Sequence, residues 1–170
     1  TASFASFERF FGATISTVTS RSPVPFFVFT PLPRTRRVRP EGVPAGIFTF
    51  TGNTRHRVEV SCLKDFADRR FVPPGELGLS TGGYTRLGAP LRHLTSRLLD
   101  QPSERRLVIV IGDGLISDEG YEGRYAWADA AHAVQEAHDA GVSMYYVGVG
   151  PVTVDPLPEV FGPRRSHRIR

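Results

Sequence analysis

The sequence predicts an α/β fold in which a mostly parallel sheet is flanked by helices. Residues 107–111 (Leu-Val-Ile-Val-Ile) form a continuous apolar run, as expected of a parallel strand buried on both faces. Residues 142–149 form a second apolar run, and a helix is expected between the two, over 126–140, with Gly141 as its C-terminal stop. A helix between two buried strands indicates a right-handed crossover between neighbouring parallel strands. In such a sheet, the ligand site lies at the carboxyl ends of the strands.

The region before these strands predicts a hairpin and another helix. Residues 45–52 are a short β-prone run that ends in glycine, and residues 56–63 alternate polar with apolar side chains. The turn-forming residues between them predict an antiparallel hairpin whose second strand is half-buried. After a loop rich in proline and glycine, 73–83, leucines recur at three- and four-residue spacing. This spacing predicts an amphipathic helix over 87–99.

Residues 13–44 do not continue this pattern. Prolines recur among Thr, Ser and Arg without a helical period, and dense prolines both prevent a helix and deny a central strand its hydrogen-bond donors. The apolar run 26–29 is expected to pair at a sheet edge at most, and the rest of this segment to be irregular or peripheral. The predicted organisation is an irregular segment 1–44, a domain 45–163 and a basic tail 164–170.

The composition is that of one soluble globular domain: 170 residues, 40% hydrophobic and 22% charged. No apolar run approaches the roughly 20 residues of a membrane helix. The N-terminus lacks the features of a secretory signal, and Thr1 in place of methionine suggests a fragment. With Cys62 as the single cysteine, no internal disulfide forms, so the expected location is the cytoplasm.

The net charge of +4 raises the question of nucleic acid, but the arginines cluster at 34–39 and 164–170. Neither cluster interleaves aromatic residues at base-stacking spacing. Both are interpreted as solvated charge, and a basic nucleic-acid-binding fragment is kept as a third hypothesis.

Four segments carry recognisable motifs: 64–66, 82–89 with 91–93, 113–118 with 121–125, and 160–162. Together they resemble one branch of the von Willebrand factor A-type (VWA) family. That branch comprises the domain that ends the nitric-oxide-reductase activation protein (NorD type) and its rubisco-activation relatives. The Thr-Arg-x-Gly and Asp-Gly elements occur across VWA domains, whereas Tyr-Glu-Gly-Arg-Tyr and Arg-His are narrower. The resemblance covers roughly 45–163 and implies a Rossmann-like VWA fold, here incomplete because its first strand is missing or degraded.

The resemblance implies a metal-ion-dependent adhesion site (MIDAS), in which three loops hold one Mg²⁺. By position, Thr85 matches the family's threonine and Asp113 its aspartate after the fourth strand. Hydroxyl and carboxylate oxygens are the hard ligands that Mg²⁺ prefers. Hydroxyls leave the ion electrophilic toward a carboxylate supplied by a partner. The alternative interpretations are that Asp113 only forms a turn and that Thr85 caps the following helix.

The family's first metal loop, Asp-x-Ser-x-Ser, does not occur in this sequence. Thr1 and Ser3 are interpreted as the tail of such a loop, so segment 1–44 is either its remnant or a misread reading frame. Two protein oxygens, one of them charged, compete poorly with the hydration of Mg²⁺. Metal binding by this chain is therefore expected to be weak or lost.

The implied function is that of a protein-binding module rather than an enzyme. Family members act as accessories of a MoxR-type AAA+ ATPase in maturing or reactivating a metalloenzyme (nitric oxide reductase) or rubisco. The ATPase supplies the energy, because this chain has no phosphate-binding Gly-x-x-x-x-Gly-Lys-Ser/Thr loop. A partner is expected to complete the metal site with an acidic residue. The candidate partner-binding residues are Arg86, Asp118, Glu122 and Arg124.

Other interpretations stay open for several of these residues. Asp118 and Glu122 either line the metal rim, pair with Arg124 or are simple surface charges. The alternative function is a Mg²⁺-dependent phosphodiesterase or phosphatase that uses Asp113, Asp118 and Glu122, although such an enzyme needs a further carboxylate. Among the remaining residues, Cys62 is expected in the core, and the expected packing between helix and sheet involves Trp127, Tyr145 and Tyr146.

Overall fold

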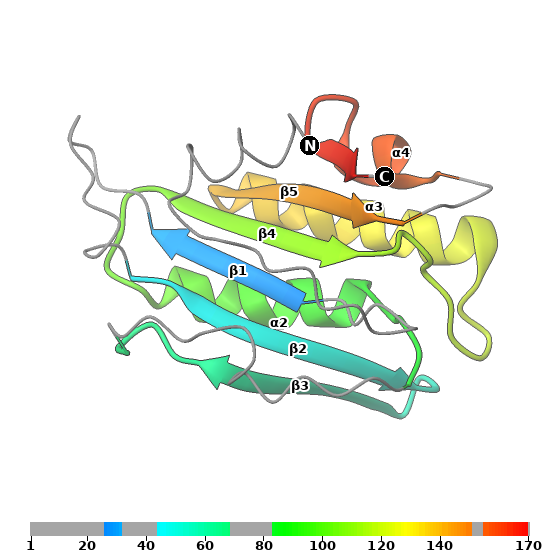
Figure 1. Ribbon diagram of the computed structural model, residues 1–170, viewed down its shortest axis with the longest axis horizontal. Coiled ribbons are helices and arrows are strands. Elements are labelled where there is room, and N and C mark those ends of the chain that lie inside the picture. The colour runs from blue at the N-terminus through cyan, green and yellow to red at the C-terminus, as the bar shows by residue number, and fades with distance from the viewer. Residues whose placement is uncertain (1–25, 32–43, 69–82, 151–154, 170) are drawn as a thin grey trace.

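The computed structural model describes residues 26–31, 44–68, 83–150 and 155–169. In these ranges a six-stranded sheet of order β3-β2-β1-β4-β5-β6 carries the helices on one face (Figure 1). The strands are β1 (Phe26–Pro31), β2 (Gly46–Asn53), β3 (Arg57–Lys64), β4 (Arg106–Gly112), β5 (Val142–Val149) and β6 (Ser166–Ile169). The helices are α2 (Gly88–Leu99), α3 (Gly123–Asp139) and α4 (Leu157–Phe161).

The sheet has a parallel half and an antiparallel half. β4 pairs in parallel with β5, and β5 with β6. The pairs β3–β2, β2–β1 and β1–β4 are antiparallel. The α/β fold and the crossover from β4 through α3 to β5 are thus confirmed, whereas the parallel arrangement is limited to the half that follows α2.

The central position of β1 corrects the expectation for residues 26–29. This run was expected at a sheet edge at most, yet β1 lies between β2 and β4, with Phe27 opposite both Phe48 and Val110. The proline argument fails locally because the apolar run itself contains no proline. Pro31 is the last residue of the strand, where no further ladder bond is needed. The central strand that was interpreted as missing or degraded is therefore replaced by one that runs antiparallel to β4.

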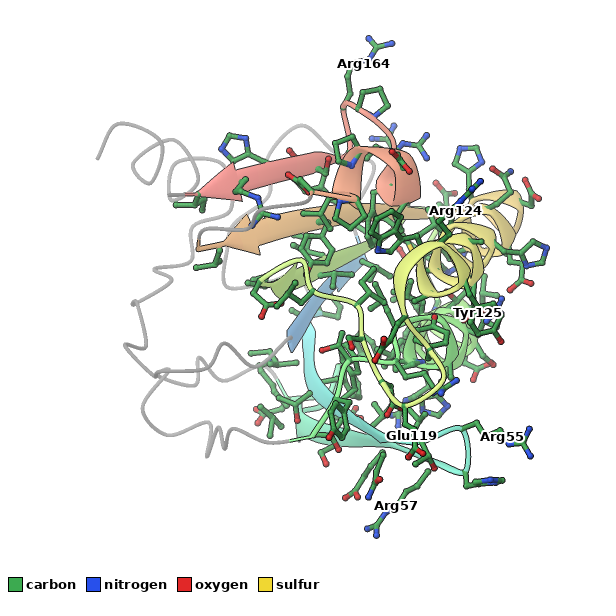
Figure 2. The ribbon with its side chains drawn as sticks, turned by 90° about the vertical axis from the view of Figure 1, so that its right-hand side faces the viewer. Arg55, Arg57, Glu119, Arg124, Tyr125 and Arg164 are labelled. Atoms are coloured by element: carbon green, nitrogen blue, oxygen red, sulfur yellow. The ribbon has the colours of Figure 1, made fainter. Side chains whose placement is uncertain are left out.

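The segment 164–170, interpreted as a solvated tail, contains β6. Side chains alternate between the two faces of this strand: Ser166 and Arg168 are partly buried, whereas His167 between them is exposed. A short strand forms here because β5 offers it a parallel partner. Arg164, just before β6, points away from the molecule (Figure 2).

The predicted hairpin is confirmed, with β2 and β3 paired antiparallel. β3 is the edge strand of the described sheet, and a register irregularity falls between Ile47 and Phe48. Cys62 lies opposite Phe48 and is exposed, so its expected place in the core is wrong. Ser61 and Cys62 keep the regular register, opposite Thr49 and Phe48, so the exposure of Cys62 comes with its place on a strand at the edge of the sheet, which the alternating pattern does not reveal.

The main core lies between the sheet and the helices. Helix α2 contributes leucines, and α3 contributes alanines, whose small side chains let the helix approach the sheet closely. β4 is buried on both faces, as predicted: Val108 and Val110 face the helices, while Ile109 and Ile111 belong to a second cluster on the opposite face. The principal helix residues of the core are Leu91, Leu94, Leu98, Ala126, Ala130, Ala133 and Ala137.

The two adjacent tyrosines of β5 divide between these faces. Tyr146 belongs to the main core, and Trp127 packs against that core from α3, as predicted. Tyr145 packs instead with the cluster on the opposite face, because successive strand residues point to opposite sides. No helix within the described ranges is long and apolar enough to cross a membrane.

Candidate functional site

The loop that follows β4 carries Asp113 at the carboxyl edge of the parallel half of the sheet. One carboxylate oxygen of Asp113 accepts a hydrogen bond from the Leu115 backbone N–H at 2.9 Å, which closes a tight turn. The carbonyl of Asp113 accepts a bond from Arg168 Nη1 at 3.1 Å, and the Gly114 N–H donates to the Tyr146 hydroxyl at 3.1 Å. Side chains from β5 and β6 therefore fix the backbone on which Asp113 sits.

The second candidate ligand, Thr85, lies on a loop that is bonded to the same region. Its backbone N–H donates to the carbonyl of Ser117 at 2.9 Å, four residues beyond Asp113. Tyr84 and Gly52 exchange two backbone bonds of 2.7 and 2.9 Å, which attach this loop to β2. The structure thus brings the segments of Thr85 and Asp113 together. That their side-chain oxygens reach one cation stays a prediction.

The helix-capping interpretation of Thr85 is wrong. Leu87, not Thr85, is the N-cap residue of α2, and it forms no side-chain capping bond. Asp113 does form a turn, but this uses only one of its carboxylate oxygens. A turn-forming role and a ligand role are therefore compatible for Asp113.

Asp118 is the most buried acid of the described residues, and it holds three loops together. Its carboxylate accepts bonds from Arg86 Nε at 3.0 Å, from the Thr54 N–H at 3.0 Å and from the Glu119 N–H at 2.7 Å. Burial alone would raise the pKa of Asp118, but these hydrogen bonds outweigh it and hold the pKa below its ordinary value. The Asp118 side chain has no exposed surface, so it stabilises the loops from inside instead of lining a rim.

Arg86 is the ion-pair partner of Asp118. From the sequence, Arg124 was a possible partner of this carboxylate. The Arg86 side chain is 12% exposed, donates from Nη2 to the Glu119 carbonyl at 3.1 Å, and lies 4.4 Å from the centre of the Tyr121 ring. The predicted grip on an acidic partner is therefore replaced by internal contacts. They fix the residue that directly follows Thr85.

Tyr121 links the loops to the two long helices. Its hydroxyl donates to Asp129 Oδ2 at 2.6 Å and accepts a bond from the Gly88 N–H at 3.2 Å. Burial, together with the neighbouring Asp129, raises the pKa of this phenol. A Cβ at Gly88 would collide with the Asp129 carboxylate, so a larger residue there would displace that carboxylate from Tyr121.

Exposed side chains surround the two loops. Glu122 and Arg124 are both exposed at the start of α3, and their role in partner binding stays a prediction. Figure 2, drawn from the side toward which the β4 and β5 arrows of Figure 1 point, shows Arg124 and Tyr125 on the near side of α3. The large exposed apolar residues next to the loops are Tyr84 (57%), Leu115 (58%) and Tyr125 (63%).

Sequence reasoning missed Arg168, Tyr146 and Tyr121 as residues that fix these loops. Arg168 lay in a presumed solvated tail, and Tyr146 carried only a packing role. Tyr121 was part of a family motif without an assigned contact. The bonds of Tyr146 with Gly114, of Tyr121 with Gly88 and of Arg168 with Asp113 join residues 32 to 55 positions apart, which no local spacing encodes.

Two described residues are the candidates for a Mg²⁺ donor set, and their joint role as ligands stays a prediction. Asp113 keeps one carboxylate oxygen outside its own turn, and Thr85 offers a hydroxyl. No group of three His, Cys, Asp or Glu residues that could hold a metal occurs within the described ranges. Thr1 and Ser3, the other proposed ligands, lie outside the described residues. Two oxygen donors alone would compete poorly with the hydration of Mg²⁺, so weak binding remains the expectation.

Comparison with known proteins identifies the family of the chain. The family model of the von Willebrand factor type A domain matches residues 36–169 of this chain. Protein NorD of Brucella suis is 39% identical over 125 residues, which are 71% of this chain and 20% of that protein. Protein NorD of Stutzerimonas stutzeri is 32% identical over 133 residues, 74% of this chain and 21% of that protein. An uncharacterized protein of Pseudomonas aeruginosa is 37% identical over 125 residues, 71% of this chain and 20% of that protein.

The chain belongs to the von Willebrand factor type A domain family, and within that family it resembles NorD proteins. It spans about a fifth of the length of these curated relatives. No solved structure matches it. The family is one of protein-interaction domains that commonly bind a divalent metal.

Proposed function

We propose that this chain is the partner-recognition module of a larger accessory protein that works with a MoxR-type AAA+ ATPase. Its target would be a metalloenzyme such as nitric oxide reductase, or rubisco. One observation carries the proposal: two tethered loops at the carboxyl edge of the sheet present Thr85 and Asp113 beside exposed apolar side chains. Such a combination suits recognition of another protein, because exposed apolar groups next to an oriented polar centre favour interfaces.

A divalent cation is part of this proposal. Mg²⁺ held by Thr85 and Asp113 would offer an electrophilic site to a carboxylate of the partner. Tyr84 directly precedes Thr85 in sequence, Leu115 lies two residues after Asp113, and both would supply apolar contact area around that carboxylate. Glu122 and Arg124 would then contact the rim of the interface. A cytoplasmic location is expected because Cys62, the single cysteine, cannot form an internal disulfide.

The proposal is tested by titrating the fluorescently labelled chain with the MoxR-type ATPase of the same cell, in millimolar Mg²⁺ or in excess chelator. We expect saturable binding that Asp113→Ala or chelation weakens by about tenfold or more, as for loss of a charged contact. Leu115→Ser is expected to weaken binding without altering its dependence on Mg²⁺. Arg57→Gln, at the exposed hairpin turn, is the matched control because Arg57 points away from the molecule (Figure 2). Equal affinity with and without Mg²⁺ would contradict the metal-dependent part of the proposal.

The two alternatives gain less support from the structure. A phosphodiesterase that uses Asp113, Asp118 and Glu122 needs carboxylates that converge on a common ion, but the Asp118 carboxylate is buried and paired with Arg86. A nucleic-acid-binding fragment would use the two arginine clusters. The first lies outside the described residues, and in the second Arg168 turns inward onto backbone carbonyls.

A further inference from the structure

We propose that Arg168 of β6 is a positioning residue for the loop that carries Asp113. The guanidinium joins the ends of two parallel strands, donating from Nη1 to the carbonyls of Asp113 at 3.1 Å and Gly150 at 3.0 Å. Its Nε donates to Asp155 Oδ2 at 3.2 Å, just before α4. One side chain thus fixes the backbone leaving β4, the backbone leaving β5 and the start of α4.

The surrounding backbone is shaped to admit this guanidinium. A Cβ at Gly114 would lie 2.6 Å from Arg168 Nη2, and one at Gly148 would lie 3.1 Å from its Cζ. Gly114 also has a φ of +88°, which side chains rarely adopt. Two glycines therefore leave room for one arginine, and the first of them directly follows Asp113.

The position of Arg168 distinguishes it from a surface charge. Its side chain is 14% exposed, and Nη2 is buried with no hydrogen-bond partner among the described residues. A buried donor without a partner is unfavourable, so the Nη1 and Nε contacts must outweigh it. A lysine ammonium cannot match the planar fork that spans these three acceptors.

The contact with Asp155 supports an alternative interpretation, in which Arg168 only anchors α4. The test must distinguish this role from positioning of the Asp113 loop. Asp155 also accepts a bond from the Leu157 N–H at 3.1 Å, and its bond from Arg168 keeps the Asp155 pKa below the ordinary value. If Arg168 served only to anchor α4, removing the Asp155 carboxylate would have the same effect as removing Arg168. If Arg168 positions the Asp113 loop, the carbonyl contacts matter more than the ion pair.

The test is amide hydrogen exchange of the full chain, read at Gly114 and Leu115, whose N–H groups donate to the Tyr146 hydroxyl and to the Asp113 carboxylate. We expect Arg168→Gln to speed exchange there by about tenfold, the loss of one charge-assisted hydrogen bond, with β4 residues 108–111 unchanged. Arg168→Lys, which keeps the charge, should give a smaller increase. Asp155→Asn should leave these two amides near the exchange rate of the unaltered chain.

Arg165→Gln is the matched control, since Arg165 is exposed and contributes its backbone carbonyl to the Tyr146 N–H. Equal exchange at Gly114 and Leu115 in Arg165→Gln and Arg168→Gln would overturn the proposal, as would an Asp155→Asn effect equal to that of Arg168→Gln. Should Arg168→Gln fail to fold, Arg168→Lys decides: unchanged exchange at these amides overturns the proposal.

A second readout rests on the proposed function. Mn²⁺ affinity, measured by electron paramagnetic resonance, should fall in Arg168→Gln and partly return in Arg168→Lys. If no form of the chain binds Mn²⁺, the metal proposal fails, whereas the exchange result still decides the positioning role of Arg168.

Discussion

At the scale of single residues, the site is organised by arginines that point inward. Arg86 holds the loop of Thr85 through Asp118, and Arg168 holds the loop of Asp113 through its carbonyl. Both arginines were interpreted from the sequence as solvated or partner-facing charge. Each instead satisfies buried acceptors, because a guanidinium can reach several acceptors at once from a single side chain.

Among the ion pairs of the described residues, the Arg86–Asp118 pair should contribute most to the free energy of unfolding. Asp118→Asn leaves Arg86 buried without its counter-charge, and we expect a loss of about 3 kcal/mol in the free energy of unfolding. Urea denaturation followed by circular dichroism measures this loss. Glu119→Gln, at the exposed neighbouring position, is the control and should change stability by less than about 0.5 kcal/mol. A loss of that smaller size in Asp118→Asn would refute the structural role of the pair.

The same pair predicts a dependence on pH. The pKa of Asp118 in the folded chain lies below its ordinary value of 3.8, so its stabilisation is present above that value. It is lost as the pH falls through the folded pKa, because protonation then favours the unfolded chain. The stability difference between the unaltered chain and Asp118→Asn should therefore shrink as the pH is lowered below 3.8. A difference that stays constant down to acid unfolding would contradict this assignment.

At the scale of elements, apolar periodicity predicted most of the structure. The strand at 142–149 has the predicted bounds, and the helices α2 and α3 were placed to within about three residues. β1 was missed because its flanking prolines dominated the interpretation, although the apolar run between them is free to pair. The long-range contacts of the loops could not be predicted, since they depend on which strand ends become neighbours.

Packing, more than charge, should hold α2 against the rest of the molecule. Leu94 is fully buried, so Leu94→Ala should lower the free energy of unfolding by about 2–5 kcal/mol. Arg92 pairs with Asp129 and Glu136 across α2 and α3, but it is 37% exposed. Arg92→Ala should therefore cost less than about 1 kcal/mol. Chemical denaturation of both variants tests the contrast, and a larger loss for Arg92→Ala would reverse our ranking of the two contributions.

At the scale of the whole molecule, the sheet is continuous from the β2–β3 hairpin to β6 only because β1 joins its two halves. The sequence resemblance predicted the family, and the family model confirms it; the metal role of Thr85 and Asp113 stays a prediction. The resemblance did not anticipate that the connecting strand runs antiparallel to β4. The loop of Thr85 is bonded to β2 and the loop of Asp113 follows β4, so β1 lies between the two strands next to the candidate metal loops.

Amide exchange of residues 27–30 tests this junction. Since β1 pairs with β2 on one side and β4 on the other, these amides should be protected to a degree similar to those of Val108–Ile111. Edge strand β3 serves as the internal reference and should exchange faster. Exchange of 27–30 as rapid as that of an unfolded peptide would mean that the two halves of the sheet are not joined by β1.

The central claim is that Asp113 and Thr85 together bind a divalent cation, and calorimetric titration of the chain with Mg²⁺ tests it most directly. Two protein oxygens hold Mg²⁺ weakly, so we predict a dissociation constant in the millimolar range. This binding should be lost in Asp113→Ala and reduced in Thr85→Val, while Glu119→Gln, a loss of one exposed acid nearby, should leave it unchanged. Micromolar affinity in the unaltered chain, or an affinity that Asp113→Ala leaves unchanged, would contradict the site.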